Sequence, residues 1–314
     1  MRHRFFKFLQ EQQVPSSPAS LEPYFYAPVE KLVSFTDVEM MKLVQSDVSL
    51  GRANLPVSVQ AASYHMSNGG QRLRMRLALQ AGISLGLSAI DASSIAGAVE
   101  LLHNATIIHD DVQDRGLMRR GRASVWSVYG DNVAICAGDL LLSAAYASLS
   151  HISKTNVLPA LMLLLHTRSA QAIAGQCADL ASAKLTTIDL AAYEQIAIDK
   201  SGALLSLPLE LSLTLAGYPN SCALALQAAE SFSIGYQIVD DLDDSEEDSG
   251  QNGRPTALNF WHIFNANGYD ADSDSMARAT GLMHLRKAAD AALQLPMRSG
   301  ALLRETALRL SARL

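Results

Sequence analysis

The feature that most constrains this chain is a carboxylate pattern that occurs twice on apolar segments. The pattern Asp-Asp-x-x-Asp is formed by Asp110, Asp111 and Asp114, and again by Asp240, Asp241 and Asp244. The first and last Asp of each motif lie four residues apart, about 40° off alignment around a helix, so they share a face. Like charges at that spacing destabilise a helix by roughly 0.2–0.5 kcal/mol. A fold that keeps two such pairs is therefore expected to hold cations between the carboxylates.

The kind of ligand favours magnesium. Neither motif has a Cys or His at ligand spacing, and Mg²⁺ binds through one or two carboxylates together with substrate phosphates. Two motifs that begin 130 residues apart predict two helices facing each other across one cavity, with metal ions bridging both to a diphosphate. Two solvated acidic helix ends are the alternative, which a single motif would leave open. The second motif, and Arg119 and Arg120 just after the first, favour the diphosphate site.

Composition narrows the class of protein further. The 314 residues are 49% hydrophobic and 18% charged, which is enough apolar material for a large helical core. The net charge of −6 argues against a nucleic-acid binder. Three widely separated cysteines (Cys136, Cys177 and Cys222) have no metal or redox spacing and indicate reduced core residues in a cytoplasmic protein. The apolar run 211–229 is interrupted at Gly217-Tyr-Pro-Asn-Ser221, so no transmembrane helix is expected.

The helical pattern predicts one domain that follows a short N-terminal segment. Four prolines and several serines in residues 1–35 predict a loosely ordered N-terminal segment, and residues 36–314 are expected to form a single all-α domain. Thr36 or Asp37 is the expected N-cap of its first helix. Pro208 predicts a kink or restart in the helix around it. Other breaks are expected at 68–70, 116–124, 129–131, 150–156 and near 296–300.

Several further motifs accompany the acidic ones. They are Gly-Gly-x-Arg-Leu-Arg at 69–74, Glu-x-x-His at 100–103, Arg-Arg-Gly at 119–121, Gly-Asp-Leu-Leu at 138–141, Lys-Ser at 200–201, and Gln237 before the second acidic motif. With these residues the chain resembles the trans-isoprenyl diphosphate synthases, or polyprenyl synthetases, over roughly residues 36–314. The resemblance implies an all-α, isoprenoid-synthase-type bundle of long helices around a deep central cavity, usually as a homodimer.

The resemblance also implies an activity. Members are Mg²⁺-dependent prenyltransferases that join isopentenyl diphosphate head-to-tail to an allylic diphosphate, giving an all-trans polyprenyl diphosphate and pyrophosphate. Three Mg²⁺ ions with bound diphosphate are expected. The chemistry is physically coherent, because metal ions and Arg or Lys donors neutralise the leaving diphosphate while an apolar pocket protects the allylic cation from water.

Site residues follow by position from the resemblance. Metal binding is expected from Asp110, Asp114, Asp240 and Asp244, with Asp111 and Asp241 acting directly or through the other ligands. Arg119 and Lys200 would hold the allylic diphosphate. The isopentenyl diphosphate would be held by Arg74, His103 and Arg120, with Gln71 beside them, while Gln237 and Ser201 would line the reacting centre.

Two departures from the family pattern concern the second substrate. Gln71 stands where the family normally has Lys, which keeps hydrogen-bond donors but removes a charge. The loop 245–256 is short, and Arg254 replaces one of the family's lysines. Both changes predict weaker use of isopentenyl diphosphate.

Product length is expected from the residues before Asp110. Ala105 and Thr106 lie one turn deeper than Asp110 and are small, and Leu102 lies a further turn down. No aromatic floor blocks the tunnel there, so a product of C20 or longer is favoured and C15 is possible.

Two other functions remain open. A class I terpene cyclase would ionise an allylic diphosphate without a second prenyl donor, which Gln71 allows but Arg74, His103 and Arg120 oppose. A non-catalytic subunit of a heteromeric synthase would have little need to retain two intact acidic motifs.

Overall fold

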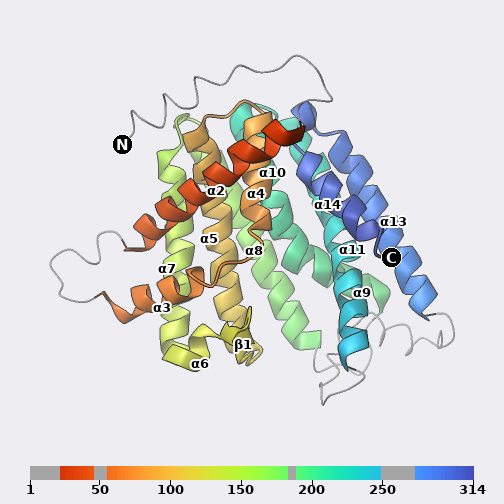
Figure 1. The fold of residues 1–314 in the computed structure, drawn as a ribbon, viewed down its shortest axis with the longest axis horizontal. Helices are drawn as coiled ribbons and strands as arrows, with labels where there is room; N and C mark the ends of the chain where they lie inside the picture. The colour runs from red at the N-terminus through yellow and green to blue at the C-terminus, as the bar shows by residue number, and fades with distance from the viewer. Residues whose placement is uncertain (1–21, 46–54, 183–188, 249–272) are drawn as a thin grey trace.

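The computed structural model describes residues 22–45, 55–182, 189–248 and 273–314, and they are almost entirely helical (Figure 1). The α-helices are α2 (Glu22–Gln45), α3 (Val57–Met66), α4 (Leu73–Ser84), α5 (Ala89–Gln113), α6 (Val125–Tyr129), α7 (Asp131–Ser148), α8 (Leu158–Ser182), α9 (Leu190–Ala197), α10 (Ala203–Ala216), α11 (Cys222–Asp248), α13 (Ser273–Leu293) and α14 (Ala301–Ser311). Short 3-10 turns lie at Leu149–His151, Pro219–Ser221 and Pro296–Arg298, and a π-helical turn, η3, spans Ile198–Gly202. The predicted all-α fold is confirmed.

Local sequence explains where two of these helices begin. The Ser88 hydroxyl accepts a hydrogen bond from the Asp91 backbone N–H (3.0 Å), which caps α5. Asp189 caps α9 in the same way through the Ala192 N–H (2.7 Å), as its position before the apolar spacing indicates. The Thr187 alternative for that cap lies outside the described residues.

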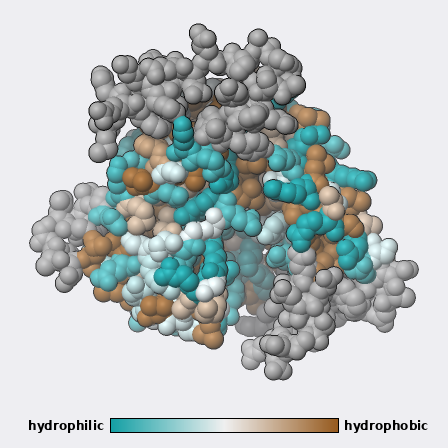
Figure 2. All heavy atoms as spheres, viewed as in Figure 1, coloured by the Kyte–Doolittle hydropathy of each residue, from teal (hydrophilic) through white to brown (hydrophobic). Residues whose placement is uncertain are grey.

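The core is built around α5, most of whose side chains are buried. Helices α4, α7 and α10 pack against α5, and α11 packs against α10 and α13. In Figure 1 the C-terminal ends of α5, α8 and α11 all lie toward the lower edge of the molecule. Hydrophilic and hydrophobic side chains are intermixed over the face shown in Figure 2. The topology therefore brings the C-terminal parts of α5 and α11, which carry the acidic motifs, to the same end of the bundle.

Three expectations about the chain's organisation need correction. Helix α2 begins at Glu22, so residues 22–35 are helical and not loosely ordered as expected. Pro23 lies in its first turn, where a missing N–H costs no helical hydrogen bond. Thr36 and Asp37 are therefore interior residues of α2, not N-caps. Helix α10 also runs unbroken through Pro208 to Ala216, so no new helix starts there, and the irregular turn is η3, which precedes α10.

A short β-hairpin joins α5 to α6, where the sequence predicts only a break. Strand β1 (Met118–Arg119) pairs antiparallel with β2 (Arg122–Ala123). The two connecting residues, Arg120 and Gly121, both have positive φ (52° and 76°), as in a type I′ turn. The other predicted breaks coincide with helix ends.

One segment, Asp131–His151, is long and apolar enough to cross a membrane by length and composition alone. Its most apolar window is 44% buried inside the protein, and a core helix of a soluble protein passes the same test. The segment contains α7, which packs against α3 and α5.

Candidate active site

The first acidic motif occupies the last turn of α5. Asp110 is half-buried, and Asp114 forms the exposed C-cap of the helix. Asp111 is only 1% exposed and pairs with Arg119 of the hairpin, whose Nη2 and Nε donate to Asp111 Oδ1 at 2.5 and 3.0 Å. Carboxylates at a helix C-terminus oppose the helix dipole. The hairpin therefore supplies a cation where the helix alone is least able to hold negative charge.

The second acidic motif lies on α11, and two uncharged side chains donate to its middle carboxylate. The buried Asp241 accepts hydrogen bonds from the Tyr193 hydroxyl and from Gln237 Nε2, both at 2.8 Å. Asp240 is exposed. The side chain of Asp244 and the whole of Arg254 lie outside the described residues. Gln237 is thus directed at the middle carboxylate of its own motif.

Lys200 and Ser201 lie on η3, which packs against α8 and α11. Lys200 Nζ donates to Asp179 of α8. A cavity of about 100 Å³ opens beside Lys200, and its lining residues come from α5, α8, η3 and α10. They include Thr106, Asp110, Ala172, Gln176, Lys200 and Leu204. Two predicted residues from opposite parts of the sequence, Asp110 and Lys200, therefore line one cavity.

Burial makes the first motif electrostatically costly. Desolvation raises the pKa of Asp110 to about 6; the charge of Lys200 opposes the rise, and that of Asp114 adds to it. Burial also raises the pKa of Asp114, with Asp179 adding to the rise and Lys200 opposing it. A bound cation would stabilise the ionised form of both groups.

Arg74 and His103 form a second polar cluster, between α4 and α5. Burial, followed by the charge of Arg74, holds the pKa of His103 well below its ordinary value. A guanidinium has no acceptor, so the 3.0 Å contact from Arg74 Nη1 makes His103 Nε2 the acceptor and leaves the ring proton on Nδ1. His103 Nδ1 and Arg74 Nε are both buried, and neither has a hydrogen-bond partner among the described residues. Two neighbouring buried donors without acceptors are suited to an anionic ligand.

The remaining predicted residues around this cluster are more exposed. Gln71 is exposed just before α4. Arg120 Nη1 donates to the backbone carbonyl of Gly69, so the hairpin tip lies against the Gly-Gly turn. An added Cβ on Gly70 would stand 2.7 Å from the Arg120 guanidinium carbon. The guanidinium tip could move aside, so it is the positive φ of Gly69 and Gly70 (67° and 137°) that makes the turn favour glycine.

The donor set fits a magnesium ion held partly by its substrate. Among the described residues, no three Asp, Glu, His or Cys side chains converge closely enough to hold a metal ion. Asp110, Asp114 and Asp240 are nevertheless oxygen donors, and Mg²⁺ takes few protein ligands with phosphate and water completing its shell. The buried Asp111 Oδ2 has no hydrogen-bond partner, which adds an unused acceptor beside Asp110.

Of the residues expected to set product length, one lines the cavity. Thr106 contributes to its wall, and its hydroxyl donates to the His103 carbonyl (2.8 Å). Leu102 and Ala105 are each 2% exposed and belong to the hydrophobic core behind it.

Sequence reasoning missed three residues of this region. Asp179 pairs with Lys200, and Tyr193 holds Asp241. Gln176 lines the cavity, and both of its amide atoms are buried without a hydrogen-bond partner. The sequence signal for two of them is that Gln176 and Asp179 are polar residues among the small and apolar side chains at the C-terminal end of α8.

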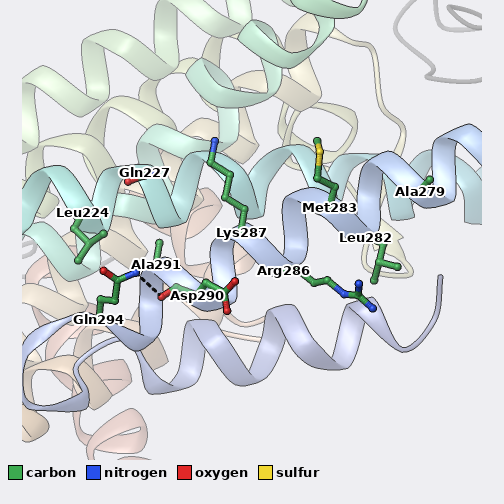
Figure 3. Close-up of a pocket in the computed structure, with 10 residues that line it drawn as sticks. All are labelled: Leu224, Gln227, Ala279, Leu282, Met283, Arg286, Lys287, Asp290, Ala291 and Gln294. Atoms are coloured by element: carbon green, nitrogen blue, oxygen red, sulfur yellow. Dashed lines mark hydrogen bonds between the residues drawn. The ribbon is translucent and has the colours of Figure 1, made fainter.

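A larger groove of about 660 Å³ lies between α11 and α13, and Figure 3 shows its lining. Leu224 and Gln227 come from α11, while Met283, Arg286, Lys287 and Asp290 come from α13. None of its lining residues belongs to an acidic motif, and Asp290 is its one carboxylate. The groove therefore lacks the paired acids that a metal–diphosphate site needs.

Solved structures with this arrangement are prenyl synthases. A geranylgeranyl pyrophosphate synthetase from the archaeon Geoglobus acetivorans superposes with a TM-score of 0.74 at 22% identity, covering 90% of this chain and 99% of that one. A decaprenyl diphosphate synthase from Rhodobacter capsulatus gives 0.75 at 20% identity, covering 93% and 98%. At these identities the likeness establishes the fold.

Sequence relatives establish the family. A (2E,6E)-farnesyl diphosphate synthase of Mycobacterium tuberculosis H37Rv is 35% identical over 177 residues, which is 56% of this chain and 49% of that protein. Geranylgeranyl pyrophosphate synthase 9 of Arabidopsis thaliana is 32% identical over 211 residues, or 63% of this chain and 59% of that protein. The chain thus spans about half the length of the relatives that it matches. The polyprenyl synthetase family matches residues 56–258, nearly two thirds of the sequence and both acidic motifs, and the chain belongs to that family.

Proposed function

We propose that this protein is a Mg²⁺-dependent trans-prenyltransferase, which joins isopentenyl diphosphate head-to-tail to an allylic diphosphate and releases pyrophosphate. One observation carries the proposal. Asp110 and Lys200 line a single cavity whose other walls include the apolar Ala172, Ile173 and Leu204. The cavity therefore brings together a carboxylate that can bind a metal ion, an ammonium group that can bind a diphosphate, and apolar side chains that can contact a hydrocarbon tail.

The metal-binding residues are proposed to be Asp110, Asp114, Asp240 and Asp244. When bound, three Mg²⁺ ions neutralise the charge that develops on the leaving diphosphate. Asp111 and Asp241 are buried and already hydrogen-bonded, so we assign them to fixing the orientation of the outer carboxylates. Arg119 and Lys200 bind the allylic diphosphate, and the C1–O bond breaks with both electrons passing to the diphosphate oxygen.

The second substrate is proposed to bind at the Arg74–His103 cluster. Buried N–H groups at Arg74 Nε and His103 Nδ1 donate to its diphosphate, with Arg120 and Gln71 at the rim. Its terminal alkene carbon, C4, attacks the allylic C1 and forms the new C–C bond, which leaves a tertiary cation at C3. A proton then leaves C2 to the released pyrophosphate, and the C–H electrons form the new C2–C3 double bond. Gln237 and Ser201 line the reacting centre, and Arg254 contributes from the short loop.

The proposed product is C20 or longer. A cavity of about 100 Å³ is smaller than the roughly 300–1,000 Å³ of typical ligand pockets, so a long tail requires lining side chains to move. Thr106, Ala105 and Leu102 mark the path, because all three are small or flexible side chains below Asp110 on α5. Ala105→Phe is expected to shorten the product, and an unchanged product distribution would reject this path.

We also propose a cytoplasmic homodimer. Large apolar side chains are exposed on α7 and α8, among them Ile135, Met162 and Leu163. The cysteines are unpaired, as in a reducing compartment, although Cys136 and Cys177 are exposed and not in the core as expected. Light scattering of the purified protein tests the dimer.

One assay tests the function. The protein is incubated with Mg²⁺, isopentenyl diphosphate and, in turn, the C5, C10, C15 and C20 allylic diphosphates, and the products are sized. Elongated products are expected from the protein alone. Pyrophosphate release with hydrocarbon formation in the absence of isopentenyl diphosphate would favour a terpene cyclase. Activity that appears only after a second synthase subunit is added would favour a non-catalytic subunit.

A further inference from the structure

The π-turn η3 that carries Lys200 lies directly on one face of α8. Gln171, Gly175 and Asp179 follow each other at four-residue intervals, so they line that face one turn apart. Gln171 Nε2 donates to Asp199 Oδ1 (2.8 Å), and Asp179 accepts from Lys200 Nζ. Two adjacent residues of the π-turn are therefore held by residues two turns apart on α8.

Gly175 lies between these two contacts, where the backbones meet. A Cβ added to Gly175 would stand 2.7 Å from the Asp199 carbonyl carbon and closer still to the Lys200 backbone nitrogen. These are main-chain atoms, which cannot rotate away as a side-chain tip can. Only glycine at this position allows the π-turn to lie where it does.

Helix α11 also approaches η3 closely, though less closely than α8 does. A Cβ on Gly202 would stand 3.0 Å from Ser233 Oγ and 3.4 Å from the Glu230 Cα. Widened π-turns recur at functional sites, and this one is packed between two helices, so it cannot shift without losing contacts on one side.

A chain of charge-assisted hydrogen bonds fixes the orientation of Gln171. Arg168 donates to both carboxylate oxygens of Glu210 on α10, each at 2.8 Å, and its Nη1 donates to Gln171 Oε1 at 2.8 Å. With its oxygen engaged, the Gln171 amide must present its NH₂ to Asp199. Gln195 donates to the other oxygen of Asp199 at 3.0 Å.

We propose that Gln171, Gly175 and Asp179 form a seat on α8 that sets the position of the π-turn and thereby aims Lys200 at the allylic diphosphate. Gln171 and Gly175 are positioning residues, and Asp179 holds the ammonium group until a diphosphate displaces it. The inference rests on the proposed function only for the identity of that diphosphate. The seat itself is a property of the metal-free protein.

The first test uses Gly175→Ala, with Ala174→Ser on the exposed side of α8 as the matched control. The added methyl group should displace the π-turn, and a misplacement of this order costs about 100-fold in kcat/KM for the allylic diphosphate. The KM for isopentenyl diphosphate should stay within about twofold, because that site lies on α4 and α5. Alanine is the better helix former, so a higher thermal midpoint with unchanged kinetics would overturn the inference.

The second test does not depend on catalysis and covers a Gly175→Ala protein that fails to fold. Gln171→Glu places a carboxylate against Asp199 and should speed amide hydrogen exchange across 198–202 in the metal-free protein. Combining it with Asp199→Asn restores a donor–acceptor pair, and exchange should return to within about threefold of the parent.

The outcomes separate the two proposals. Unchanged exchange in Gln171→Glu, or no recovery in the double variant, overturns the seat whatever the activity. If amide exchange changes in Gln171→Glu but kcat/KM for the allylic diphosphate does not, the proposal that the seat directs Lys200 at this substrate is overturned. If the parent protein makes no product with any primer, the proposed function is overturned. The hydrogen-exchange measurement then still tests whether Gln171, Gly175 and Asp179 position the π-turn.

Discussion

Asp111 and Asp241 occupy the same place in the two acidic motifs, yet their surroundings differ. Both are buried, at 1% and 6% exposure. Asp111 is paired with the Arg119 guanidinium, whereas Asp241 receives neutral hydrogen bonds from Tyr193 and Gln237. The printed contacts therefore differ in kind: uncharged side chains donate to Asp241, whereas Asp111, at the helix end where the dipole opposes negative charge, accepts from a guanidinium. Identical spacing thus sets the geometry of the outer carboxylates, while the tertiary fold decides how each motif's charge is balanced.

The largest effect is expected from removing an outer carboxylate, and its size should differ between the two motifs. Asp110→Asn should lower kcat about 1,000-fold, because it removes a metal ligand beside the cavity, and Asp240→Asn about 100-fold. In metal-free protein at pH 8, Asp110→Asn should raise the thermal midpoint, since a half-buried charge is lost, whereas Asp240→Asn should not. Steady-state kinetics and thermal melts check both. Equal melting shifts in the two variants would remove the electrostatic distinction between the motifs.

The next effect tests how the two middle carboxylates are held. Arg119→Gln leaves Asp111 buried without its cation and should destabilise the metal-free protein by about 3 kcal/mol. Tyr193→Phe removes one hydrogen bond from an uncharged donor to a carboxylate that keeps its bond from Gln237, and should cost about 1.5 kcal/mol. Urea unfolding at pH 7.5 measures both. The double variant Asp111→Asn, Arg119→Gln should recover much of the lost stability. If Tyr193→Phe destabilised the protein as much as Arg119→Gln does, the proposed difference between Asp111 and Asp241 would be contradicted.

A third effect is the pH dependence of the metal-free protein. The folded pKa of Asp110, about 6, lies above its ordinary value of 3.8, so between these pH values the unfolded chain releases the proton first. Stability therefore falls as pH rises through this window, by up to about 3 kcal/mol, and the contribution is fully present only below the ordinary value. Thermal melts from pH 4 to 8 in EDTA should show the parent losing stability relative to Asp110→Asn. Parallel curves would reject the burial argument.

The same contrast shows what a sequence can and cannot predict here. Spacing predicts which residues share a helix face, so the acidic motifs, the helix breaks and the Asp189 cap follow from local pattern. In contrast, the pairing of side chains from different helices depends on how the helices pack, which residue spacing does not encode. Nothing in the spacing pairs Asp111 with Arg119 but Asp241 with Tyr193, or brings Gly175 against the Lys200 backbone. The start of α2 was missed because prolines are typical of loops, whereas Pro23 lies in the first turn of the helix, where proline is tolerated, and Pro28 lies further along it.

The smallest effect is expected from adding a charge at Gln71, near the arginines that accompany the first motif. Arg74 and Arg120 already serve this side, so Gln71→Lys adds one exposed charge to an existing set. A charge-assisted contact at the rim should lower the KM for isopentenyl diphosphate about three- to tenfold and leave the allylic KM unchanged. Kinetics at two ionic strengths provide the check, because an exposed contact weakens with salt. Gln71→Met controls for side-chain size. An equal gain in that control, or a gain in the allylic KM, would mean that charge at this position does not act on the second substrate.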